Sequence, residues 1–343
     1  MLEIDGSMGE GGGQVLRSSL SLAALTGQAV VIDRIRAGRA KPGLMRQHLT
    51  AVRAAAEVCD GEVEGATLRS RRVVFRPGKP RAGRYQFVIG TAGSTTLVCQ
   101  TVLPILLAAE GESEVHFEGG THNPMAPPYD FLERVFAPVV RALGAELELA
   151  IGRPGFYPAG GGRFSLHLSP PKEPKRVTLS EPLTLPKIDP FVISARLPQH
   201  VAEREAAVVA EAFSLDPRDV EIRKVKAAGP GNVVGIAVHD RERVVELSSA
   251  IGEKGRPAET VARNAVADTR AFLTRGLSVG EHLADQLLLP MSFGGGAFVT
   301  GPLSLHASTN VEVLRLFLGS DAASVGGEGE VVTVAVKAQH HRH

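Results

Sequence analysis

Apolar positions along the chain alternate between a spacing typical of helices and short runs typical of strands. The helical spacing is clearest in two segments, through Leu44, Leu49, Val52 and Ala56 and through Phe131, Val135, Val139 and Leu143. Short runs rich in β-branched or aromatic residues, such as residues 30–32 and 115–117, separate the helical segments. The changes of spacing fall near glycine-rich stretches, and this pattern predicts a mixed α and β fold.

The alternation occurs three times. A glycine-rich loop, a helical segment and a short strand follow one another in residues 6–38, 90–120 and 280–301. A second loop and helix come after each unit, in residues 38–59, 119–144 and 301–319. A glutamine recurs near the front of the first helix, as Gln14, Gln100 and Gln286. Self-similarity on this scale predicts a large α+β domain of three similar modules around a common axis.

Extra chain separates the second unit from the third. Residues 170–174 (PPKEP) mark a turn-rich boundary, and residues 183–277 have a pattern of their own. Its strand-like runs are 191–195, 235–238 and 244–247, and its helical segments are 201–213 and 258–273. We therefore expect a discontinuous domain of residues 1–182 and 278–338, a smaller α/β insert of residues 183–277, and a tail of residues 339–343.

Composition narrows the class of protein. Hydrophobic residues make up 43% of the chain and charged residues 22%, and the formal net charge is +1. Bulk basicity therefore gives no sign of nucleic-acid binding, and an anionic substrate would have to be held by local arginine clusters. Cys59 and Cys99 form neither a disulfide framework nor a zinc motif, so we expect a reducing, cytoplasmic location.

The two chain ends carry few signals. The first residues lack a basic start and an apolar signal core, and no run is long enough to span a membrane. We therefore expect no membrane partner, and nothing points to an obligate protein partner. The final residues 339–343 (QHHRH) contain three histidines, which favours either metal binding or a frayed or added tail.

The densest glycine-rich loop, residues 9–14 (GEGGGQ), is a candidate anion site because backbone N–H groups at helix starts attract phosphates. It matches neither a Walker loop nor a dinucleotide fingerprint. Positive side chains follow it, at Arg17 and in the connection 34–43, which contains Arg36 and Arg39. Arginine forks suit phosphate oxygens, although a solvated basic loop would give the same pattern. Glu10, inside the loop, is equally consistent with a helix cap and a magnesium ligand.

Among eleven histidines, His306 has the most suggestive position. The segment 302–310 (PLSLHASTN) places it just ahead of a helix that we expect to start at Val311. In the register of the repeats, it falls near the basic loop of the first unit, so that equivalent loops would converge on one cleft. A neutral imidazole in such a cleft can attack a phosphoryl group and form a phosphoramidate. A structural role for the ring is the alternative.

Several ordered motifs together resemble the RNA 3'-terminal phosphate cyclase family. They are residues 9–17 (GEGGGQVLR), 35–44 (IRAGRAKPGL), 46–49 (RQHL), 93–100, 126–128 (APP), 155–162 (GFYPAGGG), 200–205 (HVAERE), 284–286 (ADQ) and the loop of His306. The match covers nearly the whole chain. It implies a domain of three repeated modules, similar to cyclases and enolpyruvyl transferases, with a smaller domain inserted before the third module.

The resemblance also implies a reaction and its participants. An RNA 3'-phosphate end would become a 2',3'-cyclic phosphate with use of ATP and a magnesium or manganese ion, through AMP carried covalently on His306. Glu10 would hold the metal ion. The phosphates or the RNA end would be oriented by Arg17, Arg36, Arg39, Gln47 and His48. The nucleotide would be contacted by Gln100, Pro127, Phe131, His282, Leu283, Ala284, Asp285 and Gln286.

The chain departs from the family pattern in two places. His282 stands where family members often have an aromatic residue, and Pro154 stands where a basic residue usually precedes Gly155. Three other readings remain: a non-catalytic cyclase-like protein in ribosomal RNA processing, an enolpyruvyl transferase, and a bare RNA-binding module. The presence of both Glu10 and His306 favours the enzyme.

Overall fold

The computed structural model describes residues 1–339, so the predicted tail falls almost entirely outside the described residues. The first module forms a four-stranded sheet in the order β1-β2-β4-β3, with two helices on it. Its elements are β1 (Leu2–Asp5), α1 (Gln14–Thr26), β2 (Val30–Asp33), α2 (Arg46–Val58), β3 (Glu62–Glu64) and β4 (Val73–Arg76). Strands β1 and β2 are parallel, and β4 runs antiparallel to β2.

The second module repeats this topology, with a sheet in the order β5-β6-β8-β7. Its elements are β5 (Arg84–Val88), α3 (Thr95–Leu107), β6 (Ser113–Gly119), α4 (Tyr129–Phe131), η1 (Leu132–Phe136), α5 (Ala137–Ala142), β7 (Glu146–Arg153) and β8 (Gly162–Ser169). The second helix of this module is therefore a continuous segment whose middle turn, η1, has π-helical hydrogen bonding.

The third module has the same order again, β9-β14-β16-β15. Its elements are β9 (Val177–Leu179), α8 (Glu281–Gly294), β14 (Gly296–Thr300), α9 (Leu305–Leu318), β15 (Ala323–Glu328) and β16 (Val331–Val336). Because β9 pairs in parallel with β14, the insert interrupts the third module after its first strand and does not precede the module. The three-residue strand is too short to produce a recognisable sequence pattern.

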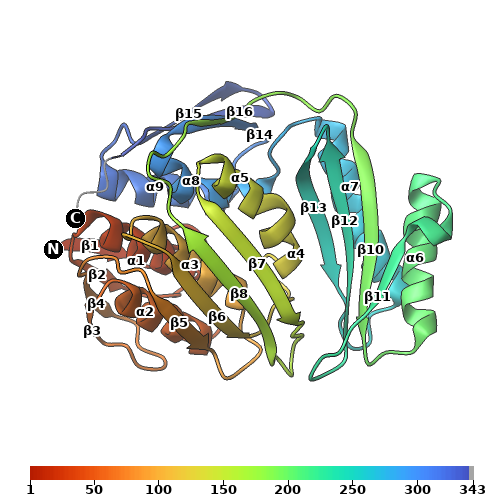
Figure 1. Cartoon of the computed structure of the whole chain (residues 1–343), viewed down its shortest axis with the longest axis horizontal. Helices are drawn as coiled ribbons and strands as arrows, with labels where there is room; N and C mark the ends of the chain where they lie inside the picture. The colour runs from red at the N-terminus through yellow and green to blue at the C-terminus, as the bar shows by residue number, and fades with distance from the viewer. Residues whose placement is uncertain (340–343) are drawn as a thin grey trace.

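The insert contains one mixed sheet in the order β11-β10-β12-β13. Its elements are β10 (Lys187–Ala195), α6 (Gln199–Phe213), η2 (Pro217–Asp219), β11 (Glu221–Lys224), β12 (Gly231–Asp240), β13 (Arg243–Ile251) and α7 (Ala258–Arg275). It lies on one side of the three modules, next to the segment α4–η1 (Figure 1). Arg223 of β11 pairs with Asp130 of α4 at 3.3 Å across this boundary.

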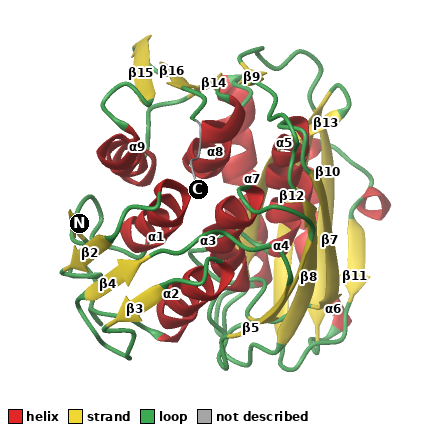
Figure 2. Cartoon of the chain, turned by 60° about the vertical axis from the view of Figure 1, so that its left-hand side comes forward, coloured by secondary structure: helices red, strands yellow, loops and turns green. Residues whose placement is uncertain are grey.

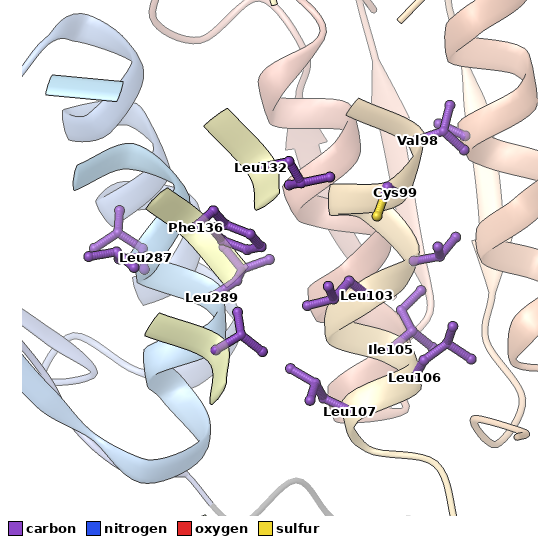
Figure 3. Close-up of a cluster of buried hydrophobic side chains, with 14 of the residues drawn as sticks. Val98, Cys99, Leu103, Ile105, Leu106, Leu107, Leu132, Phe136, Leu287 and Leu289 are labelled. Carbon is purple, nitrogen blue, oxygen red and sulfur yellow. The ribbon is translucent and has the colours of Figure 1, made fainter. Parts of the chain in front are cut away.

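The helices of the three modules gather in the middle of the molecule, with the module sheets on the outside (Figure 2). Helix α1 packs against α3 and α9, and α8 packs against α9 and α3. Leu103 of α3, Phe136 of η1 and Leu289 of α8 meet in the core between these helices (Figure 3). The predicted α+β fold of three repeated modules and a smaller insert is therefore confirmed. None of the described helices combines the length and hydropathy needed to cross a membrane.

Candidate active site

A cleft of ≈ 1230 Å³ opens where the fronts of the module helices meet and where the insert faces them. Residues from all three modules and from the insert line it. Because four parts of the chain contribute, the cleft exists only in the folded molecule. It contains most of the residues that the sequence singled out.

The glycine-rich loop forms the floor on the first-module side. Gly9 and Gly11 have φ angles of 60° and 57°, in the left-handed region that glycine adopts without strain. A Cβ on Gly11 would lie 2.7 Å from the backbone nitrogen of Gly38, and one on Gly13 would lie 2.4 Å from Nε2 of His48. The glycines therefore allow the loop to press directly against the basic connection and against α2.

A hydrogen-bond network joins the helix fronts behind this loop. Gln14 donates from Nε2 to Oδ1 of Asp285 at 2.8 Å, and Asn310 donates from Nδ2 to the same oxygen at 3.2 Å. Arg17 donates to Oε1 of Gln14 at 3.2 Å. Burial raises the pKa of Asp285 to about 7, against the opposing effect of Arg17, and burial lowers the pKa of Arg17 to about 10. The network ties α1, α8 and α9 together at the cleft.

The repeated glutamines take part in the same junction. Gln100 of α3 donates a hydrogen bond to Gln286 of α8, while Gln14 of α1 bonds to the residue before Gln286. The sequence repeat thus places three amide side chains where the three modules meet. All three line the cleft.

Two arginines of the basic connection, Arg36 and Arg39, make different kinds of contact. Arg36 donates from Nη1 to the carbonyl oxygens of Lys41 at 2.7 Å and Gly43 at 2.9 Å, so this group holds its own loop in shape. Arg39 instead reaches the carboxylate of Glu10 at 2.8 Å. Both side chains line the cleft. Burial, and then the charge of Arg39, lower the pKa of Arg36.

His306 lies inside helix α9, in its first turn, and not ahead of the helix as the sequence suggested. The helix begins at Leu305 because Ser304 caps it, with Oγ accepting a hydrogen bond from the backbone nitrogen of Ala307 at 3.2 Å. Nε2 of His306 is 3.0 Å from Oε2 of Glu10, and the side chain is 39% exposed. The ring of His306, in the third module, therefore faces the glycine-rich loop of the first module.

The surroundings of His306 favour its neutral form. Burial lowers its pKa most, Arg17, Arg39 and His282 lower it further, and Glu10 raises it. The net direction of the pKa is downward from 6.5, which favours the uncharged imidazole at neutral pH. A neutral, accessible ring beside two guanidinium groups, those of Arg17 and Arg39, has the properties required of a nucleophile toward an anionic phosphoryl group.

Gln47 and His48 lie at the start of α2. Oε1 of Gln47 accepts a hydrogen bond from the backbone nitrogen of Ser94 at 2.8 Å, which links the first module to the glycine-containing loop of the second. Burial, then Arg17, Arg36 and Arg39, lower the pKa of His48 to about 3. Its Nδ1 is buried and has no hydrogen-bond partner among the described residues.

The candidate nucleotide-binding residues divide into two groups. Gln100, Pro127, Phe131, His282, Asp285 and Gln286 line the cleft, although Phe131 is itself only 1% exposed. Leu283 and Ala284, by contrast, are buried, with side-chain surfaces only 1% and 2% exposed, and they do not line it. A one-residue step along a helix turns the side chain by roughly 100°, which explains why neighbours in one motif face different ways.

Sequence reasoning missed two asparagines. Asn123 and Asn310 line the cleft, are 9% and 2% exposed, and each has an Oδ1 atom without a partner in the described structure. Asn310 follows His306 by one helical turn, and that spacing could have revealed it. Asn123 lies in a loop between β6 and α4 and carries no such signal.

Whether the cleft suits a metal ion depends on the ligand atoms that its side chains offer. In residues 1–339, no group of three or more His, Cys, Asp or Glu side chains could hold a metal ion. Glu10 does offer one carboxylate at the cleft, 37% exposed. One carboxylate completed by substrate phosphates and water fits the way in which magnesium is usually bound.

Three modules of one topology, an inserted sheet and a cleft shared between them define the class of the protein: an α+β fold of repeated modules. Residues 8–323 match the family model described as RNA 3'-terminal phosphate cyclase (RTC), and the chain belongs to this family, which contains ATP-dependent cyclases. The predicted family is thereby confirmed.

Among solved structures, the enolpyruvyl transferase NikO from Streptomyces tendae is similar to 97% of the chain at 10% identity, with a TM-score of 0.36. The match covers 48% of the NikO chain, so the protein spans about half the length of that relative.

Proposed function

We propose that the protein converts RNA 3'-terminal phosphates into 2',3'-cyclic phosphates at the expense of ATP, with His306 as the nucleophile. The observation that carries this proposal is the position of His306: a neutral, exposed imidazole 3.0 Å from Glu10, in the cleft shared with Arg17 and Arg39. A non-catalytic relative would have no need of this arrangement. Family membership supplies the class of substrates, ATP and RNA ends.

In the first step, a ring nitrogen of His306 attacks the α-phosphorus of ATP. The bond from that phosphorus to the bridging oxygen breaks and pyrophosphate leaves. The other ring nitrogen gives up its proton to water, which leaves a neutral ring carrying AMP through a phosphoramidate bond. In the free protein, Nε2 of His306 lies 3.0 Å from Oε2 of Glu10, an oxygen that can accept a hydrogen bond from the ring. Arg17 and Arg39 offset the negative charge of the reacting phosphates.

In the second step, an oxygen of the RNA 3'-phosphate attacks the phosphorus of the bound AMP and restores the free histidine. In the third step, the adjacent 2'-oxygen attacks the 3'-phosphorus, loses its proton and displaces AMP, which closes the ring. Transfer through the enzyme converts a poor leaving group into a good one.

Glu10 would hold a magnesium or manganese ion. When bound, the ion would stabilise the negative charge of the phosphates. Its carboxylate also contacts both Arg39 and His306, so it orders the two residues in the free protein. Gln100, Gln286 and His282 would contact the nucleotide, with Pro127 and Phe131 packing on its base.

The test is incubation with ATP labelled at the α-phosphate, with magnesium or manganese. The wild-type protein is expected to acquire an acid-labile, alkali-stable label, and His306→Ala is expected to lose it, by about 1,000-fold or more. Circular dichroism and thermal unfolding establish that the variant is folded. A folded variant that still acquires the label would refute the assignment of His306, and an unlabelled wild-type protein would favour the non-catalytic alternative.

A further inference from the structure

Positive charge is concentrated in one part of the chain. Between Asp33 and Arg84 lie 13 of the 38 lysines and arginines but only five of the 37 aspartates and glutamates. Because the whole chain has a net charge of only +1, the remainder is negative. This segment covers α2, β3 and β4 of the first module and the loops between them. The near-neutral total therefore conceals a strongly basic segment.

Some of these cations are neutralised locally. Arg34, Arg72, Arg76, Arg81 and Arg84 pair with carboxylates. Six exposed cations of the segment have no ion-pair partner among the described residues: Lys41, Arg46, Arg53, Arg69, Arg71 and Lys79. Lys41 lines the cleft, and Arg46 precedes two residues that also line it.

The loop that carries Arg69 and Arg71 is attached to the basic connection at the cleft. The backbone nitrogen of Ile35 donates to the carbonyl of Arg71 at 3.0 Å, and that of Leu44 donates to Ser70 at 2.9 Å. The backbone nitrogen of Arg69 donates in return to Leu44 at 2.7 Å. These bonds hold the two arginines beside the connection that contains Arg36 and Arg39.

A glycine makes this contact possible. Gly43 has a φ angle of 81°, and a Cβ at this position would lie 2.3 Å from the carbonyl oxygen of Arg69. Arg69 itself has a φ angle of 66°, which is uncommon for a residue with a side chain. The loop is therefore held in a defined shape, and its two exposed arginines lie on a segment bonded directly to the basic connection at the cleft.

The facing wall of the cleft has the opposite balance. The insert and the start of α8 contribute three exposed carboxylates and two arginines to the lining, together with the buried Glu246: Glu253, Asp268, Glu281, Arg256 and Arg275. A polyanion that leaves the cleft in this direction would meet net negative charge. The direction over the first module offers unpaired cations instead.

We propose that Lys41, Arg46, Arg69 and Arg71 form a track for the sugar-phosphate backbone of the RNA on the 5' side of its terminal nucleotide. The proposal rests on the function proposed above, which places the RNA 3' end in the cleft. The track contacts phosphates, so it binds RNA strands without regard to base sequence. It also gives longer substrates an affinity that a terminal nucleotide alone does not have.

The test compares Arg69→Ala/Arg71→Ala with a variant of equal charge, Lys79→Ala/Arg81→Ala. The control residues lie near the other end of α2, where the backbone nitrogen of Arg81 donates to the carbonyl of Val58. Binding of a fluorescent single-stranded RNA of about ten nucleotides with a 3'-phosphate is measured by anisotropy, without ATP, over a range of salt concentrations. Self-adenylylation with α-labelled ATP is measured in parallel.

The track variant is expected to bind the RNA about tenfold more weakly, and the slope of log affinity against log salt is expected to fall by about 1.4, or about 0.7 for each lost phosphate contact. Arg69→Lys/Arg71→Lys should restore most of the affinity, whereas a dinucleotide with a 3'-phosphate should bind all variants equally. Unchanged RNA binding by the track variant, or an equal loss in the control, would overturn the track. If the wild-type protein does not self-adenylylate, the proposed reaction is contradicted. The anisotropy comparison of RNA binding still decides whether the track exists.

Discussion

The first turns of α2 and α9 occupy equivalent places in two modules of the same topology, and each carries a histidine that lines the cleft. His48 is enclosed by Arg17, Arg36 and Arg39, which together with burial lower its pKa to about 3. His306 is 39% exposed and faces the carboxylate of Glu10. The uncharged form is favoured in both rings at neutral pH, so the protonation state does not distinguish them.

Access and neighbours do distinguish them. A Cβ on Gly13 would overlap with Nε2 of His48 at 2.4 Å, which shows how closely the glycine loop covers that ring. The ring of His306 has no such cover and lies at the front of its helix. The first turn of the second module helix therefore carries a polar element of the arginine wall in the first module and the candidate nucleophile in the third.

The largest expected effect comes from removing each histidine separately. His306→Ala should lose self-adenylylation by about 1,000-fold or more, whereas His48→Ala should keep it within about tenfold of wild type. The reason is that only His306 would form the covalent bond. Quantification of the label per folded molecule checks the ratio. Equal losses of self-adenylylation in the two variants would contradict the different roles given to His48 and His306.

A second expected effect concerns Asp285. This carboxylate precedes the repeated glutamine of the third module, whereas Gly13 stands at the corresponding place in the first module. The pKa of Asp285 is raised from 3.8 to about 7 in the folded protein. Between these values the folded state retains a proton that the unfolded state has lost, so this group lowers the free energy of unfolding as pH rises. Asp285→Asn keeps the Oδ1 acceptor for Gln14 and Asn310 but removes the charge.

The stability advantage of Asp285→Asn over the wild type should therefore be absent below about pH 4 and should grow between pH 5 and pH 8 by on the order of 2 kcal/mol. Urea unfolding at the two pH values measures the difference. Glu205 and Glu246, whose pKa values burial also raises to about 7, should leave part of the pH dependence in the variant. A variant less stable than wild type at pH 8 would mean that attraction to Arg17 outweighs the cost of burial.

The smallest expected effect comes from the helix caps. Ser304 caps α9 with its side chain, whereas Met45, at the same place before α2, makes no side-chain cap bond. Ser304→Ala should cost about 1 kcal/mol of stability, and Met45→Ser should add a few tenths to about 1 kcal/mol. Urea midpoints give both values. If Met45→Ser also destabilises the protein, the close packing at the start of α2 controls that helix end more than the cap does.

Much of the fold was predictable from local patterns. Apolar spacing and glycine-rich turns predicted the three repeats and the insert, because helical and strand periodicity depend on residues near in sequence. The start of α9 was wrong by six residues, since Ser304 was not recognised as its cap. Strand β9 was missed, and with it the point where the third module is interrupted, because three residues carry too little pattern.

The candidate site was predictable as a set of residue types, but its arrangement was not. The amino-acid sequence alone determined the repeated modules, the family and the chemistry available at Glu10, Arg39 and His306. Only the tertiary structure decided that Glu10 and His306, from opposite ends of the chain, lie 3.0 Å apart, and that Leu283 faces the core. The physical reason is that a side chain's pKa, exposure and partners depend on groups brought near in space, and local sequence patterns do not encode those distances.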